Sequence, residues 1–367
     1  MDISRRILCL IVGVLALFSC SDKNVSYNDV VPLEVGNTTN IVTKKITDEF
    51  TDFHIVRLDN SEKALLSWVK KVCVTDRGLY ILDYKNPAQI LHFDKDGKFI
   101  CKIGDYGKKK SEYISIYNFS TNNVGDTIVI LDSRRVLLFN DKGEHIKTET
   151  LNEHIDDLLL TKQGMMTSDY HHENSNLMTL YKKTDVVDSY INNEYKNIRG
   201  TSPSQNYLQQ CGERLCYYDY FSSRFYLMDI KHPNTQKCYE LRSDKILNEV
   251  KAKEKGVDRS KYAYVNNYVI DDSTIIGNIH IDRVNYDFCI NMRTDDFSLV
   301  KLEGSHYFFD SYSDGYYYKI LSPSYILDIL QKSYNSKARE IFSEALKPYI
   351  GKVSEKDNYY VLRMRRK

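Results

Sequence analysis

The sequence predicts an all-β fold, a six-bladed β-propeller with short helical insertions. The first observation is an internal repeat: LYILDYKNPAQILHFDKDGKFICKIG, residues 79–104, returns as IVILDSRRVLLFNDKGEHIKTE, residues 128–149. The second is the offset of 46–49 residues between the copies, each with several short strands, which is typical of propeller blades. The matching positions are Ile81 and Ile130, Asp83 and Asp132, Phe93 and Phe139, and Gly97 and Gly143.

The composition fits a globular chain of one large or two ordinary domains. Of 367 residues, 42% are hydrophobic and 28% are charged, and the formal net charge is +1. This balance carries no global bias toward nucleic acid or an anionic membrane surface, so we expect no nucleic-acid partner. The 30 tyrosines against one tryptophan suit half-buried strands, in which the ring packs and the hydroxyl reaches water.

The N-terminus has the pattern of a secretory signal. Arg5-Arg6 precede an apolar run, Ile7–Phe18, that ends at Ser19-Cys20 and is too short to span a bilayer. The end of this run, Leu-Phe-Ser-Cys, resembles a bacterial lipobox, in which the cysteine becomes the first residue and carries the lipid. We therefore expect Cys20 to be the lipid attachment site. The alternative is a plain signal peptide with an incidental cysteine.

This signal sets the predicted domain organisation. Residues 1–19 form a lipoprotein signal peptide, residues 20–50 a lipidated tether with an N-terminal extension, and residues 51–367 a single propeller domain. Each buried CH₂ of an acyl chain contributes about 0.8 kcal/mol, so a multiply acylated cysteine would hold the protein durably on a membrane. We expect a monomer in the cell envelope, anchored in the outer membrane. Whether it faces the periplasm or the cell surface stays open.

Six cysteines remain beyond the signal and the lipid site: Cys73, Cys101, Cys211, Cys216, Cys238 and Cys289. An exported protein can form disulfides, and Cys211 and Cys216 are the candidate pair because they flank a short turn. Four of the six instead lie in strand-like runs, where cysteine commonly acts as a small buried hydrophobe. We expect most of them to be free and buried.

The remaining strand patterns give six blades and a closing strand. A propeller ring commonly closes by pairing an N-terminal strand with the last blade, since open sheet edges are a liability. Phe53–Leu58 is the candidate closing strand, and Val30–Val35 is a second extended piece. The predicted blades are 68–104, 113–150, 158–182, 215–229 and 262–302, with a sixth built from 306–309, 315–320 and 359–363.

Two segments break the β pattern and predict helical insertions near residues 243–256 and 322–350. Ser243 is a candidate N-cap followed by apolar residues at helical spacing. Ser322-Pro323 opens the second segment with proline in its favoured first helical position. Such insertions between propeller strands are surface additions or lids, where functional residues are often found.

The chain resembles the six-bladed β-propeller lipoproteins of Gram-negative gut-type bacteria. The resemblance rests on the lipobox at Cys20, the two blade motifs, the loop Gly104–Tyr113 and the end Asp357–Leu362. In this loop the chain keeps Glu112-Tyr113 but has lysines where the family has Gly-Pro-Gly. The resemblance implies an exported propeller that binds something, and it supplies no catalytic residues to carry over.

A run of lysines makes that loop the sharpest charge feature. Lys108, Lys109 and Lys110, with Tyr113, are the candidate ligand-binding residues. Together with Lys70-Lys71 and Arg134-Arg135, they could form a basic rim for an acidic glycan or another polyanion. The alternative is that these lysines are simply exposed to solvent and bind no ligand, which is the usual case for charged residues in a loop.

Two segments have metal-capable residue types. Asp94-Lys95-Asp96-Gly97 resembles the start of a calcium loop but lacks the later ligands, so a tight hairpin turn is the better interpretation. His171 and His172 lie between Asp169 and Glu173, and two adjacent histidines can bind one metal ion only if they lie in a loop rather than in a strand. A polar surface loop without a metal is the simpler interpretation of this segment. We therefore expect no metal and no cofactor.

The tyrosine clusters 217–220, 262–268 and 316–318 could supply rings for stacking sugars, although strand packing explains most of them.

No recognisable catalytic motif is present. We therefore favour a membrane-anchored binding or interaction module for a glycan or a partner protein. The alternative is a polysaccharide lyase or hydrolase with its site at the mouth of the propeller channel, where converging carboxylates with shifted pKa values would favour the enzyme.

Overall fold

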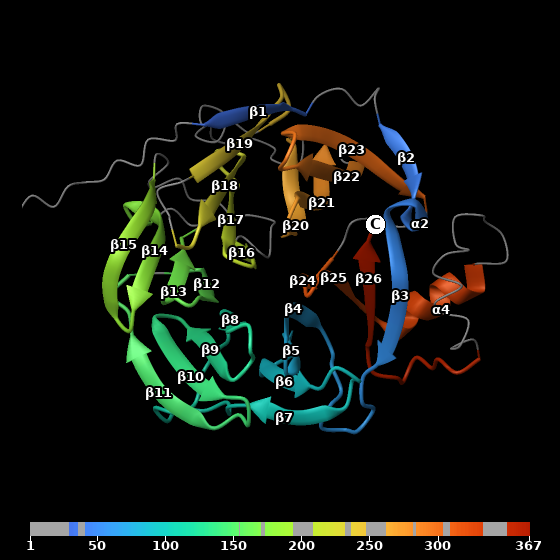
Figure 1. Cartoon of the computed structure of the whole chain (residues 1–367). Helices are drawn as coiled ribbons and strands as arrows, with labels where there is room; N and C mark the ends of the chain where they lie inside the picture. The colour runs from blue at the N-terminus through green and yellow to red at the C-terminus, as the bar shows by residue number, and fades with distance from the viewer. Residues whose placement is uncertain are drawn as a thin grey trace, which may run out of the picture.

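The computed structural model describes residues 29–35, 41–153, 155–169, 173–193, 208–231, 236–246, 262–281, 284–303, 309–332 and 351–367. Over these residues the chain is a six-bladed β-propeller with two short helices, so the predicted fold class is confirmed. Figure 1 shows six sheets arranged around a central axis, each with one edge strand facing that axis.

The first three blades each contain four antiparallel strands in chain order, and they begin with the two repeat copies found in the sequence. Blade 1 comprises β4 (Val69–Thr75), β5 (Gly78–Asp83), β6 (Gln89–Phe93) and β7 (Phe99–Ile103). Blade 2 comprises β8 (Asn118–Thr121), β9 (Thr127–Asp132), β10 (Arg135–Asn140) and β11 (His145–Thr150). Blade 3 comprises β12 (Asp157–Leu160), β13 (Met165–Ser168), β14 (Asn176–Lys182) and β15 (Asp185–Asn192).

Blades 4 and 5 contain the same four antiparallel strands and each gains a fifth, described below, whereas blade 6 takes its fourth strand from the N-terminal part of the chain. Blade 4 comprises β16 (Leu208–Cys211), β17 (Arg214–Asp219), β18 (Arg224–Asp229) and β19 (Gln236–Arg242). Blade 5 comprises β20 (Tyr264–Ile270), β21 (Thr274–Ile281), β22 (Val284–Asn291) and β23 (Asp296–Glu303). Blade 6 comprises β24 (Ser311–Ser313), β25 (Tyr316–Leu321), β26 (Tyr360–Arg366) and, from the N-terminal part of the chain, β3 (Phe50–Arg57).

The ring closes through β3, which pairs antiparallel with β26, so the predicted closing strand is confirmed. Two further strands precede it on the outside of the ring: β1 (Val30–Glu34) pairs parallel with β19, and β2 (Val42–Lys45) pairs parallel with β23. Helix α2 (Ile46–Glu49) then leads into β3. Figure 1 shows β1, β2 and β3 following the rim past blades 4, 5 and 6. Residues expected as an N-terminal extension therefore contribute strands to two blades.

The second helical insertion is confirmed where the structure describes it. Helix α4 (Pro323–Lys332) begins as predicted, because Ser322 Oγ accepts a hydrogen bond from the Tyr325 N–H at 3.2 Å. Residues 333–350 of this insertion, most of the insertion predicted near 243–256, and residues 306–308 of the predicted sixth blade lie outside the described residues. The first strand of blade 6 is β24, which begins at Ser311 rather than in 306–309.

The apolar core is divided among the interfaces between blades. Six clusters of buried side chains can be distinguished in the described chain, one between each pair of neighbouring blades. Ile81 and Phe93 belong to the cluster between blades 6 and 1, whereas Ile130 and Phe139 belong to the cluster between blades 1 and 2. The apolar positions of the repeat are therefore contacts between blades, and a ring is needed to bury them all.

The aspartates of the repeat fasten the connections between blades. Asp83, at the end of β5, accepts hydrogen bonds from the backbone N–H groups of Ser67 and Trp68 at 3.0 and 2.8 Å. Asp132, its counterpart, accepts from the N–H groups of Ile114 and Ser115 at 3.0 and 3.2 Å. Each aspartate thus satisfies otherwise unpaired backbone donors of the chain that enters the same blade.

The glycines of the repeat allow the preceding blade to approach closely. Gly97 has a φ of 83°, and a Cβ added there would lie 2.5 Å from the carbonyl oxygen of Arg57 in β3. At Gly143, with a φ of 80°, an added Cβ would overlap the carbonyl oxygen of Lys102 in β7. Glycine is required at both turns for its backbone conformation and for space.

The two faces of the ring differ in their connections. On one face, which we call the loop face, the second strand of each blade is joined to the third, and the chain crosses from one blade to the next. The insertion that contains α4 also lies on the loop face, between β25 and β26. The short connections on the opposite face join first to second and third to fourth strands.

All six cysteines of the propeller are free, as expected for most of them. Cys216, Cys238 and Cys289 are buried, and the other three are partly buried. Cys211 pairs with Arg214 across the β16–β17 hairpin, while Cys216 pairs with Gln209, so the candidate disulfide is not formed. Within the described residues, no helix is long and apolar enough to cross a membrane.

Candidate functional site

A large cavity opens on the loop face, where blades 5, 6 and 1 meet. It has a volume of about 930 Å³. Its walls come from the starts of β4 and β22, the ends of β23 and β25, helix α4, and the residue before β26. The cavity therefore sits beside the seam at which the last blade meets the first.

Trp68, the single tryptophan, forms part of the rim and has a fixed backbone. Its N–H donates to Asp83 Oδ1 at 2.8 Å, and its carbonyl oxygen accepts from the Tyr84 N–H at 2.7 Å. The side chain is nevertheless 61% exposed. Its ring meets the Tyr84 ring edge-on, with centroids 5.6 Å apart. An exposed ring on a fixed backbone is a ready surface for a ligand, because little conformational entropy is lost on binding.

Exposed aromatic side chains of the described residues all lie on the loop face. Four of them belong to connections around blade 1, and the fifth belongs to α4. They are Trp68, Tyr84, Tyr106, Tyr117 and Tyr325, and we call this set the aromatic face. Exposed aromatic rings gathered on one side of a protein mark an interaction surface.

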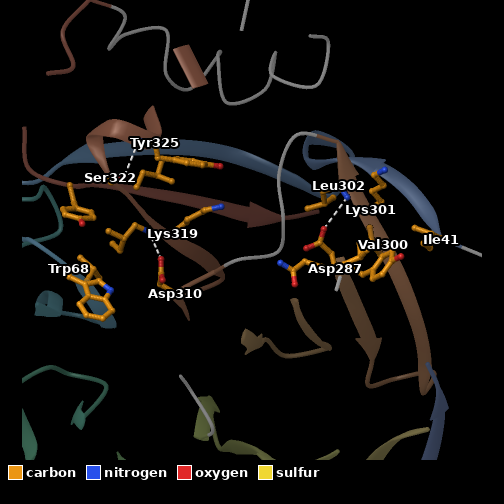
Figure 2. Close-up of a pocket in the computed structure, with 17 residues that line it drawn as sticks. Ile41, Trp68, Asp287, Val300, Lys301, Leu302, Asp310, Lys319, Ser322 and Tyr325 are labelled. Atoms are coloured by element: carbon orange, nitrogen blue, oxygen red, sulfur yellow. Dashed lines mark hydrogen bonds between the residues drawn. The ribbon is translucent and has the colours of Figure 1, made fainter. Parts of the chain in front are cut away.

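Lys319 and Asp310 line the cavity next to Trp68, as Figure 2 shows. Burial raises the pKa of Asp310 to about 6, and burial lowers the pKa of the Lys319 amine. One oxygen of Asp310, Oδ2, accepts from the Ile320 N–H at 2.6 Å. The Lys319 Nζ lies 5.5 Å from the centre of the Tyr325 ring. Ionisable groups with shifted pKa values in a cavity are candidates for a functional role.

The opposite wall carries a second pair of charges. Figure 2 shows Asp287 and Lys301 across the cavity from Lys319. Asp287 is fully buried, and its Oδ2 accepts from the Leu302 N–H at 3.4 Å. Lys301 is exposed. The cavity therefore combines charged and aromatic groups, as a site for a polar ligand requires.

The central channel forms a separate cavity of about 460 Å³, and Asp310 lines it as well. Near its mouth, Asp157 accepts from Asn118 Nδ2 at 2.6 Å and from the Leu208 N–H at 3.1 Å, and Lys71 Nζ lies 3.4 Å away. These contacts join the innermost strands of blades 1 to 4. Because backbone and side-chain donors occupy its oxygens, Asp157 has a structural role.

The lysine run predicted from the sequence lies on the connection from blade 1 to blade 2, outside the lining of the large cavity. Lys108, Lys109 and Lys110 are all exposed. Lys109 pairs with Glu112 at 3.0 Å, so part of the charge is neutralised. Tyr113 is only 1% exposed and belongs to the core between blades 1 and 2, so its ring cannot contact a ligand on the surface.

The predicted turn at Asp94–Gly97 is confirmed. Asp94 Oδ1 accepts from the N–H groups of Asp96 and Lys98 at 3.0 and 2.8 Å, and the Gly97 N–H donates to the Asp94 carbonyl at 3.1 Å. His171 and His172 lie outside the described residues. In the described part of the chain, no group of three or more His, Cys, Asp or Glu could hold a metal ion.

The tyrosine clusters do not form the aromatic face. Their central members are buried in the core, namely Tyr217, Tyr218, Tyr220, Tyr268 and Tyr317. Tyr316 is partly buried and lies under the guanidinium groups of Arg363 and Arg365, at 5.2 and 4.5 Å from the ring centre. Strand packing, the alternative that the sequence left open, therefore accounts for these rings.

Residues 29–365 match a family described as a domain of unknown function, DUF4934. The chain belongs to the DUF4934 family. This DUF4934 propeller is similar to a Bacteroides fragilis protein provisionally named as exported, with 16% identity and a TM-score of 0.71, covering 92% of this chain and 99% of that one. It is also similar to a DUF4221 family member from Bacteroides vulgatus, with 9% identity and a TM-score of 0.52, covering 87% and 97%. Such low identities show the fold alone. The comparison with curated proteins finds no match.

Proposed function

We propose that this DUF4934 protein is an exported module, held in the cell envelope by a lipid on Cys20, that binds a glycan through its aromatic face. The observation that carries the proposal is the gathering of the exposed aromatic rings of the described chain on the loop face, beside the large cavity. The apolar C–H groups of a sugar ring pack against an aromatic face, while its hydroxyls need polar partners, which the cavity supplies.

The cavity favours a glycan over a partner protein. Its volume of about 930 Å³ falls in the range of small-ligand sites, roughly 300–1,000 Å³. A stable protein partner would instead cover about 800 Å² of surface on this side, with aromatic anchors at its centre. Here the exposed rings extend from the cavity rim at Trp68 outward to Tyr106, a layout that suits a chain of sugars running from the cavity across the face.

The anchor is supported by the basic, apolar and Ser-Cys sequence of the N-terminus. The similar Bacteroides fragilis protein is provisionally named as exported. If Cys20 is lipidated, protein produced in a bacterium that processes lipoproteins should partition into the detergent phase, and its intact mass should include acyl chains. Cys20→Ser should move it to the aqueous phase. Equal partitioning of both forms into the aqueous phase would contradict the anchor.

The binding proposal is tested with the full-length chain, purified in detergent, on an array of neutral and acidic polysaccharides. We expect at least one glycan to bind, and Trp68→Ala to lower the affinity about tenfold or more, since stacking on an aromatic side chain contributes roughly 1–3 kcal/mol where it has been measured for nucleic-acid bases. The matched control is Ile146→Ala, which removes a side chain that is 55% exposed on β11, away from the aromatic face. No bound glycan, or equal loss in both variants, would contradict the proposal.

Polysaccharide cleavage is the second candidate, because burial raises the pKa of Asp310 to about 6 and the same cavity holds Asp287. A carboxyl group with such a pKa can act as a general acid near neutral pH. Product analysis of every bound glycan decides between the two. Shortened or unsaturated products that disappear in Asp310→Asn would establish an enzyme, whereas an intact glycan would establish a binding module.

A further inference from the structure

We propose that the ligand is a neutral glycan, and that Lys319 and Asp310 hold one of its sugar rings by hydrogen bonds to neighbouring hydroxyls. This inference rests on the proposed function and names the ligand class of the same site. It follows from the unused hydrogen-bonding capacity of two side chains, from the charges of the cavity wall, and from the position of Trp68.

Lys319 offers donors that the described residues do not use. The lysine ammonium carries three N–H donors. Among the described residues, no carboxylate lies within 4.0 Å of Lys319 Nζ and no acceptor bonds to it. The Nζ lies 5.5 Å from the centre of the Tyr325 ring, and the charges of Asp310 and Asp287 act on it without a direct ion pair. An amine that is partly withdrawn from water without protein acceptors is costly unless another polar group occupies the cavity. Sugar hydroxyls are suitable acceptors.

Asp310 offers an acceptor beside it. Its Oδ2 takes the Ile320 N–H at 2.6 Å, and its own backbone N–H donates to the Tyr318 carbonyl at 2.9 Å, so the carboxylate is held in one orientation. Its Oδ1 accepts no hydrogen bond from the described part of the chain. Because Ile320 follows Lys319 in β25, the Asp310 carboxylate is held against the strand that carries Lys319, and both side chains line the same cavity. One donor and one acceptor that line the same cavity can bind two hydroxyls of one sugar ring.

Within the described part of the chain, the lysines and aspartates of the wall sum to zero charge. The described lining residues include two lysines, Lys301 and Lys319, and two aspartates, Asp287 and Asp310. A carboxylated or sulfated sugar would bring a further negative charge next to two aspartates, one of them fully buried. A neutral sugar meets donors and acceptors without that repulsion. The exposed lysines at 108–110, which would attract an acidic glycan, lie elsewhere on the loop face.

The Trp68 ring supplies the apolar contact. Figure 2 shows Trp68, Asp310 and Lys319 together on one side of the cavity, with the two polar side chains above the ring in this view. A sugar packed against the indole would therefore present its hydroxyl edge toward Asp310 and Lys319. Stacking and hydrogen bonding would act on the same ring, as recognition of a neutral sugar requires.

The test uses the full-length chain in detergent, with neutral probes (mannan, xylan, β-glucan and galactan) and acidic probes (polygalacturonate and chondroitin sulfate). The affinity for each bound probe is measured at low and high salt for the wild type, Lys319→Met, Asp310→Asn, Trp68→Ala and Ile146→Ala. Asp310→Asn keeps an oxygen for the Ile320 N–H and so guards against a mere folding effect. Circular dichroism and thermal unfolding confirm that each variant is folded.

We expect neutral probes to bind without salt dependence, and Lys319→Met and Asp310→Asn each to lower the affinity about tenfold or more, the effect of losing a hydrogen bond to a charged group. Binding of acidic probes alone, weakened by salt and unchanged in Lys319→Met, would overturn this inference but leave the glycan-binding proposal intact. Neutral binding that is lost in Trp68→Ala but unchanged in both polar variants would also overturn it. Absence of binding to every probe would refute both proposals.

Discussion

Replacing Asn358 by alanine should loosen the closure of the ring and the segment that carries Trp68. Asn358 precedes β26, and its side chain is 1% exposed. Its Nδ2 donates to the carbonyls of Asp59 and Ala64 at 2.8 and 2.7 Å, and its Oδ1 accepts from the Leu66 N–H at 3.1 Å. One side chain therefore organises the connection from β3 to β4, which ends at Trp68.

The size of the effect follows from these three bonds and a fourth, in which the same Oδ1 accepts from the Tyr359 N–H at 2.9 Å. Alanine would leave two carbonyls and two N–H groups without this partner, and each buried polar group that loses its partner costs about 1–3 kcal/mol. With partial entry of water, we expect the free energy of unfolding to fall by about 3–5 kcal/mol. Because Trp68 would no longer be held firmly, glycan affinity should also fall at temperatures where the variant is folded.

Urea unfolding and hydrogen exchange of residues 58–68 measure the two parts of this prediction. The matched control is Asn123→Ala, which changes an exposed asparagine on the opposite face and should stay within about 0.5 kcal/mol of the wild type. A loss below about 1 kcal/mol in Asn358→Ala, or unchanged hydrogen exchange in this connection, would refute the reasoning.

Three further predictions concern single residues. Asp157→Ala should lower the free energy of urea unfolding by about 3–5 kcal/mol, because it removes a buried partner of Lys71; a loss under about 1 kcal/mol would contradict a structural role. Gly97→Ala should lower the melting temperature more than Gly212→Ala does. Both glycines have a positive φ, but an added Cβ would overlap β3 at Gly97 and would meet nothing within 4 Å at Gly212. Equal effects of the two substitutions would show that the contact with β3 is unimportant. The folded-state pKa of Asp310, about 6, lies above its ordinary value of 3.8, so between these two pH values the folded state binds more protons than the unfolded state. We therefore expect the stability contributed by this group to fall by about 2 kcal/mol as pH rises from 4 to 7. Asp310→Asn should remove this loss when wild type and variant are compared at both pH values, and parallel pH profiles would refute it.

The fold could be predicted from the sequence because the repeat residues act locally. Asp83 binds the backbone that enters its own blade, and Gly97 occupies a turn of its own blade against the preceding strand, so both features recur with the blade. The rim strands β1 and β2 could not be assigned to a partner, since their pairing with blades 4 and 5 spans about 200 residues or more. Only the closing strand followed from a general requirement, the need to cover a sheet edge.

The candidate site could not be predicted, because its residues are far apart in the sequence. Trp68 and Lys319 are 251 positions apart in the sequence and meet only because the ring closes. The lysine run and the tyrosine clusters drew attention as local patterns, yet Tyr113 and most cluster tyrosines are core residues. A single tryptophan just before the first blade, at the seam, was the one signal that could have indicated the rim of the site.

Placing a binding site at the seam couples ligand affinity to ring closure. The connection that ends at Trp68 is held by Asn358 from the last blade and by Asp83 from the first, and Tyr359 Oη donates to the Ser67 carbonyl at 3.0 Å. A ligand that contacts Trp68 and Lys319 together would bridge both sides of this seam and so stabilise the closed ring. Glycan binding should therefore raise the melting temperature of the wild type and should protect the 58–68 connection from hydrogen exchange. A glycan that binds through the exposed lysines at 108–110 would leave that connection unchanged, so this measurement separates a site at the seam from a site on the outer loop.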